Sequence, residues 1–152
     1  MLLLPDLIAF SESFVAERPN IENNLTVMDD EEAGTLYKDV VNSGNLCTLI
    51  TVVPTHDSAT PDEDNALFKN NAIFLIIKKI DERGGNQQKL DRVAICQQEV
   101  LAFAQKIKSL KANFGSNCIF SDIDLESIQV TPLNNYFKGA GYAVEFSTST
   151  GF

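Results

Sequence analysis

Residues 89–111 read KLDRVAICQQEVLAFAQKIKSLK. Apolar side chains recur in this stretch every three or four positions, which is the spacing of one face of an α-helix. These side chains are Leu90, Val93, Cys96, Val100, Phe103, Ile107 and Leu110. The opposite, polar face consists of Asp91, Arg92, Gln97, Gln98, Glu99, Gln105, Lys106 and Lys108. The spacing predicts an amphipathic helix over Lys89–Lys111, about 34 Å long, whose apolar stripe must be buried.

Strand-like segments on both sides of this helix offer the surface that its stripe requires. Ala72–Ile80 is apolar almost throughout and predicts a strand covered on both faces. Lys78 and Lys79 are expected to mark its emergence into water. Ser127–Pro132 and Gly141–Thr148 alternate apolar and polar residues, which predicts an antiparallel hairpin with one solvated face.

The first half of the chain predicts smaller elements. Asp6–Glu17, with Pro5 in its first turn, has the pattern of a short helix. Strands are expected over Asn24–Met28 and over Leu46–Val53, the second ended by Pro54. Asp29–Gly34 has the composition of an acidic turn, Thr55–Asn65 that of a surface loop, and Leu36–Val41 fits a strand or a helical turn equally well.

Together these elements predict one α+β domain over residues 1–152. Its sheet is expected to be mainly antiparallel, with four or five strands packed on one side by a long and a short helix. No apolar run reaches the eighteen residues of a membrane-spanning helix, and residues 1–6 lack the basic start of a signal peptide. Cys47, Cys96 and Cys118 lie in apolar contexts and are expected to be buried free thiols.

Charge is unevenly distributed along the chain, whose net charge is −9. Residues 1–64 carry thirteen acidic and two basic side chains, whereas residues 65–152 carry eight and ten. An acidic first half argues against nucleic-acid binding. The asymmetry is compatible with a contact between copies in which an acidic half faces the lysines of the long helix; a solvated acidic surface is the alternative.

No pattern of residues names a chemistry, and neither a cofactor nor a metal is expected. His56 is followed by Asp57 and Ser58, but adjacent side chains of an extended segment point apart, so a solvated loop histidine is favoured over a catalytic base. The acidic clusters Asp29–Glu32 and Asp62–Asp64 lack the spacing of a calcium loop.

The order of elements resembles that of tail-terminator and neck proteins, the head–tail joining components of tailed bacteriophages and related contractile particles. The residues that carry the resemblance are Asp124–Asn135, DLESIQVTPLNN, and Gly141–Phe146, GYAVEF, at the end of the predicted helix–hairpin succession. The resemblance implies a structural, ring-forming protein that joins or terminates a tail tube, without catalytic residues.

The resemblance also implies partners. These are further copies in a ring, as a hexamer or dodecamer, and tail-tube, sheath or connector proteins of a particle assembled in the bacterial cytoplasm, with no membrane partner. The residues expected at these contacts are Asp29, Asp30, Glu31, Glu32, Asp62, Glu63, Asp64, Lys106, Lys108, Lys111 and Phe152. A stand-alone bacterial ligand-binding or adaptor domain is the alternative, and an enzyme using His56 is a third reading.

Overall fold

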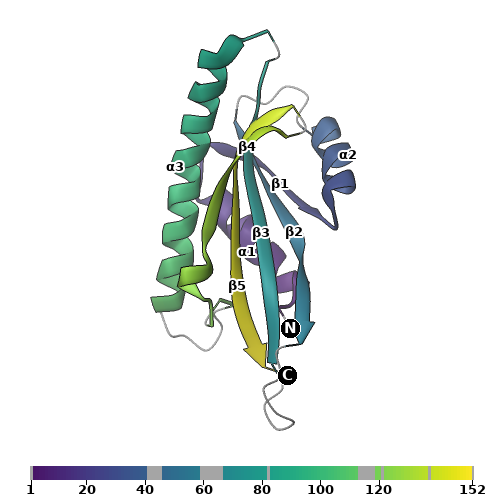
Figure 1. Ribbon diagram of the computed structural model, residues 1–152, viewed down its shortest axis with the longest axis vertical. Coiled ribbons are helices and arrows are strands. Elements are labelled where there is room, and N and C mark those ends of the chain that lie inside the picture. The colour runs from purple at the N-terminus through teal and green to yellow at the C-terminus, as the bar shows by residue number, and fades with distance from the viewer. Residues whose placement is uncertain are drawn as a thin grey trace.

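A five-stranded sheet forms the centre of the protein, and helices pack on both of its faces in the computed structural model (Figure 1). The structure describes residues 2–40, 46–58, 67–81, 83–112, 119–120, 122–136 and 138–151. Its elements are α1 Leu4–Ala16, β1 Ile21–Val27, α2 Asp30–Val40, β2 Cys47–Ser58, β3 Leu67–Lys79, α3 Gly85–Ala112, the 3-10 turn η1 Leu125–Ser127, β4 Gln129–Tyr136 and β5 Gly139–Gly151. The predicted α+β fold is confirmed.

The strands lie in the order β1-β2-β3-β5-β4. Within the described sheet, β1 and β2 run parallel, and the other neighbouring strands are antiparallel. Two parallel neighbours need a crossover connection, and α2 supplies part of it between β1 and β2. The expected carboxy-terminal hairpin is confirmed as β4 and β5, paired from Gln129 opposite Glu145 to Tyr136 opposite Gly139.

The long helix is confirmed as α3, but it begins at Gly85, before the predicted start at Lys89. Gly85 has a φ of 69°, a left-handed conformation that glycine adopts without steric cost, and this places the change of direction directly at the helix start. The buried part of its predicted stripe is Cys96, Val100, Phe103 and Ile107. Leu90 is 51% exposed, so the stripe does not extend to the first turns.

One face of the sheet is covered by α1 and α3 together. The core beneath them is aromatic: Phe10 and Phe14 of α1, Phe103 of α3, Phe74 of β3 and Phe146 of β5 are buried. Phe103 lies 4.7 Å from Phe74 and 5.0 Å from Phe14 between ring centroids, within the range of favourable aromatic contacts. The two predicted helices therefore share one core, as expected.

The other face carries α2, which the sequence did not predict. Ala33 and Tyr37 of α2 pack on Ile50, Leu75 and Ile77 of the sheet. The prediction of helices on one side only is therefore incomplete, and the prediction of a turn over Asp29–Gly34 is wrong because helix begins at Asp30. The segment that had been left open between strand and helical turn is helical through Val40.

Strand β2 passes through Pro54 rather than ending there. Its pairing with β3 shifts register between Val52 and Thr55. Such a bulge takes Pro54, which has no backbone N–H, out of the hydrogen-bonded ladder. The predicted strand end is thus wrong, and so is the prediction of loop structure for Thr55–Ser58; residues 59–65 of that predicted loop lie outside the described residues.

Strand β3 is covered on both faces, as predicted, with Phe74 and Ile76 in one core and Leu75 and Ile77 in the other. Lys78, expected in water, is 5% exposed. Its place at the end of β3 puts it on the same face as Phe74 and Ile76, beneath α3, because side chains alternate along a strand. Among the described helices, none is long and apolar enough to cross a membrane.

Candidate functional site

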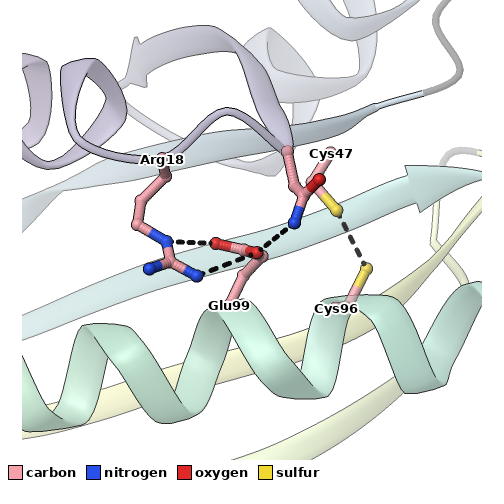
Figure 2. Close-up of polar contacts among 5 residues, drawn as sticks. Arg18, Cys47, Cys96 and Glu99 are labelled. Atoms are coloured by element: carbon pink, nitrogen blue, oxygen red, sulfur yellow. Dashed lines mark hydrogen bonds and ion pairs between the residues drawn. The ribbon is translucent and has the colours of Figure 1, made fainter.

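A buried ion pair joins α3 to the connection between α1 and β1. Arg18 donates to the Glu99 carboxylate through Nε, at 2.7 Å from Oε2, and through Nη2, at 3.2 Å from Oε1 (Figure 2). Asn20 donates its Nδ2 to the same Oε1 at 2.9 Å. The Glu99 side chain has no exposed surface, whereas that of Arg18 is 32% exposed. The pair thus lies at the rim of the aromatic core, with the carboxylate inside.

The partners of Glu99 determine its charge state. Burial by itself would raise the pKa of this carboxyl group, but hydrogen bonds from Arg18 and Asn20 and the guanidinium charge outweigh burial and lower the pKa. The hydrogen bond to Glu99 in turn raises the pKa of Arg18. Both side chains are therefore charged at neutral pH, and the pair fixes the start of β1 against the middle of α3.

The prediction that Glu99 lies on the polar face of the long helix is wrong. Glu99 lies between Cys96 and Phe103 at helical spacing, so it belongs to the buried stripe. Its helical spacing from these two apolar residues could have predicted that Glu99 is buried. Its partners Arg18 and Asn20 lie far from it in the sequence, and periodicity gives no indication of such a contact.

Two free thiols meet beside this ion pair. The Sγ atoms of Cys47, the first residue of β2, and Cys96 of α3 are 3.7 Å apart, and neither residue is exposed (Figure 2). Cys96 Sγ also lies 3.6 Å from the carbonyl oxygen of Ala140. The prediction of buried free thiols is confirmed for these two, and Cys118 lies outside the described residues.

The acidic residues expected at contacts form the start of α2. Asp29 accepts a hydrogen bond from the backbone N–H of Glu32, at 2.9 Å, and Glu32 accepts one from the backbone N–H of Met28, at 2.6 Å. This arrangement is a variant of the capping box, in which the return bond from Glu32 goes to the N–H of Met28, one residue before the N-cap Asp29. Glu31 is exposed in the same turn, and Asp30 is the first helical residue.

The lysines expected at contacts lie at the end of α3. Lys106 forms an ion pair with Glu17, at 2.6 Å, and Lys111 donates a hydrogen bond to the carbonyl oxygen of Ile123. Lys108 is exposed, and the described chain gives its ammonium group no ion pair. The other predicted contact residues, Asp62, Glu63, Asp64 and Phe152, lie outside the described residues.

Among the residues that the structure describes, the acidic and basic sets do not come together within one chain. The acidic start of α2 belongs to the helix on one face of the sheet, and Lys108 belongs to α3 on the other (Figure 1). Strand β4, at one edge of the sheet, is exposed along most of its length. These two charged surfaces and this edge are therefore available to different neighbours.

His56 belongs to a hydrogen-bond cluster around a buried asparagine that the sequence analysis missed. Its Nδ1 lies 2.6 Å from Oδ1 of Asn70, which also accepts the backbone N–H of Leu2. Asn70 Nδ2 donates to the carbonyl oxygen of Thr148. Asp57 instead lies near Asn71, with 3.5 Å between Oδ2 and Nδ2, so His56 and Asp57 contact different partners. The His56 side chain helps to fix the amino-terminal segment against β3.

A cleft of about 360 Å³ lies between α1 and α3, and its lining includes Arg18, Glu17 and Lys106.

In the described part of the chain, no group of three or more His, Cys, Asp or Glu side chains could hold a metal ion. No family model matches the sequence, and no curated protein matches it.

Proposed function

We propose that this protein is a ring-forming structural component at the tail end or neck of a phage or phage-like contractile particle, where it joins or terminates the tail tube. The observation that carries the proposal is the separation of charge across the sheet. Acidic side chains gather at the start of α2 on one face, and Lys108 is exposed near the end of α3 on the other.

Such a separation favours head-to-tail association. When two different surfaces of the same molecule are complementary, each copy binds the next, and the series closes into a ring where the rotation permits. Glu31 of one copy and Lys108 of the next are the pair that this contact is proposed to bring together, since both are exposed. The carboxylates of Asp29 and Glu32 already serve the helix start.

The exposed edge of β4 supports a second kind of contact. Its backbone groups on the side away from β5 are not paired in the described sheet, and Pro132 removes one donor from the strand. An edge of this kind can add a strand from a neighbouring protein. We assign this edge to the tail-tube, sheath or connector partner of the ring.

Native mass spectrometry of the purified protein at low ionic strength tests the ring. We expect the mass of a hexamer or dodecamer, and a ring with a central channel in electron micrographs. Lys108→Glu should shift the population to monomer, and Glu31→Lys combined with Lys108→Glu should restore the ring. Arg83→Glu is the matched control, since it makes the same charge change at an exposed residue just before α3 and should leave the ring intact.

The contact is electrostatic, so higher salt should also favour the monomer, because screening at about 1 M salt acts over roughly 3 Å. A protein that stays monomeric at low salt, and also when mixed with tail-tube and connector proteins, would rule the ring out.

The cleft between α1 and α3 favours the alternative, a stand-alone ligand-binding or adaptor domain. Its volume of about 360 Å³ falls within the range of small-molecule sites. The charged side chains in its lining are already paired, Lys106 with Glu17 and Arg18 with the buried Glu99. A monomer whose melting temperature rises with a small metabolite, and whose response is lost in Lys106→Met, would establish this alternative.

A further inference from the structure

The two thiols in contact beneath α3 have no part in the proposed ring. Cys47 and Cys96 come from different elements, and their sulfur atoms are 3.7 Å apart in a part of the core with no exposed surface (Figure 2). A disulfide requires the sulfur atoms to approach to about 2.05 Å. The two sulfur atoms, which are already in contact, must therefore approach further for the bond to form.

A buried ammonium group lies next to this pair. Ile77 pairs with Thr48 across β2 and β3, so the following residue, Lys78, lies alongside Cys47. On its other side Lys78 pairs with Ala140, whose carbonyl oxygen contacts Cys96 Sγ. Lys78 therefore lies between the strands that carry the contacts of both thiols, on the face that α3 covers.

The charges around the thiols favour one of them as the thiolate. The hydrogen bond with Cys96, together with the charge of Lys78, lowers the pKa of Cys47 against the opposing effect of burial. The same hydrogen bond and burial raise the pKa of Cys96. The other charged groups that act on Cys47 are Glu99, which opposes the thiolate, and Arg92, which favours it.

We propose that Cys47 and Cys96 form a site of reversible oxidation, in which hydrogen peroxide converts the two thiols into an intramolecular disulfide between β2 and α3. The Cys47 thiolate attacks one peroxide oxygen and the O–O bond breaks. The departing hydroxide takes up the proton that the Cys47 thiol had lost, so a sulfenic acid and one water form. The sulfur of Cys96 then attacks the Cys47 sulfur, loses its proton and displaces the hydroxyl group as a second water. Two thiols and one peroxide thus give one disulfide and two waters.

The structural consequence is a covalent link between the start of β2 and the middle of α3. In the reduced protein, the described contacts between these elements near the thiols are noncovalent, and the Arg18–Glu99 ion pair lies next to them (Figure 2). The disulfide would close a loop that contains β2, β3 and the first half of α3, and it would restrict the opening of the helix from the sheet.

Mass spectrometry after peroxide treatment tests the proposal. The reduced, folded protein is exposed to hydrogen peroxide, remaining thiols are alkylated in denaturant, and the digest is mapped. We expect a peptide pair linked through Cys47 and Cys96, reversed by dithiothreitol, in the wild type and in Cys118→Ser. Cooperative thermal unfolding should persist after oxidation, which shows that the link forms within the native fold.

Two lysine variants test the role of the ammonium group. Lys78→Met should slow the formation of the link severalfold, because the charge of Lys78 favours the Cys47 thiolate that attacks the peroxide. Lys79→Met is the matched control, since Lys79 is the next residue along β3 and should leave the rate unchanged. Equal rates in the two variants would overturn the assignment of Lys78.

Three outcomes would overturn the oxidation site itself. They are links that mainly involve Cys118, a link between Cys47 and Cys96 that forms only in denaturant, and peroxide treatment that leaves both thiols free for alkylation. None of these depends on ring formation, so the proposal stands or fails separately from the proposed function.

Discussion

The two faces of the sheet differ in what covers them. Beneath α1 and α3, the first face holds interlocked aromatic rings and a buried ion pair at its rim. The second face is covered by α2 at one end, and beyond it Asp57, Asn71 and Ser147 form a polar ladder across the strands. A hollow of about 320 Å³ lies over this part of the sheet. The first face therefore provides most of the stability, and the second leaves polar surface for contacts.

The largest effect is expected from removing a ring at the centre of the first face. Phe103→Ala should lower the free energy of unfolding by about 4 kcal/mol, because the fully buried ring contacts Phe10, Phe14 and Phe74 and leaves a cavity among them. Urea denaturation measures it. Ile73→Ala, on the half-buried part of the second face, should cost about 1 kcal/mol, and equal losses would contradict the difference between the faces.

The ion pair at the rim of the first face should contribute the next largest effect, and it should depend on pH. Glu99→Gln should lower the free energy of unfolding by about 2 kcal/mol at neutral pH, since it removes the buried carboxylate charge that pairs with Arg18. The folded pKa of Glu99 lies below its unfolded value of about 4.3. Its contribution is therefore present at neutral pH and is lost as the pH falls through the folded pKa.

Melting temperatures recorded between acidic and neutral pH should show this as a steeper acid loss in the wild type than in Glu99→Gln. Glu145→Gln is the control, because Glu145 is exposed on the second face. An acid limb that Glu99→Gln leaves unchanged would show that the pair adds no pH-dependent stability.

On the second face, the capping of α2 should have a smaller effect. Asp29→Ala should cost about 1 kcal/mol, because it leaves the backbone N–H of Glu32 without its acceptor. Chemical denaturation followed by circular dichroism measures it. Glu31→Ala, an exposed carboxylate in the same turn, should cost only a few tenths of a kcal/mol, and a reversed order would contradict the capping box.

The smallest expected effect is a gain. The Tyr37 hydroxyl group of α2 is buried and has no hydrogen-bond partner among the described residues, and burial raises its pKa. Tyr37→Phe removes a polar group that folding takes out of water, so it should raise the free energy of unfolding by up to about 1 kcal/mol. A loss of stability in the same denaturation assay would mean that the hydroxyl group is satisfied by a water molecule.

The first face was more predictable than the second. The stripe of α3 and the apolar run of β3 have strong periodicity, and both were identified from the sequence. Helix α2 was missed because its start, Asp29 to Gly34, has the composition of a turn, and only the reciprocal bonds of Asp29 and Glu32 identify it as a helix cap. The strand end predicted at Pro54 was wrong because a bulge accommodates this proline within β2.

The candidate sites depended on contacts that no local pattern contains. Glu99 and Lys78 were predicted to be exposed to solvent because charged residues are rarely buried without partners. Arg18 and Asn20 provide the partners of Glu99, and they come from a distant part of the chain. The contacts predicted for the acidic start of α2 and for the lysines at the end of α3 remain a prediction. The structure places these two groups on opposite faces of the sheet.

The sequence by itself determined the long amphipathic helix, the doubly covered strand and the terminal hairpin, because apolar periodicity follows directly from which side of an element leaves water. The tertiary structure alone decided that β1 pairs in parallel with β2, that α2 covers the second face, and that Cys47 meets Cys96. Those features depend on which distant segments share one core. The hydrophobic effect is non-directional and favours contact with any apolar neighbour, so it does not specify where in the chain that neighbour lies.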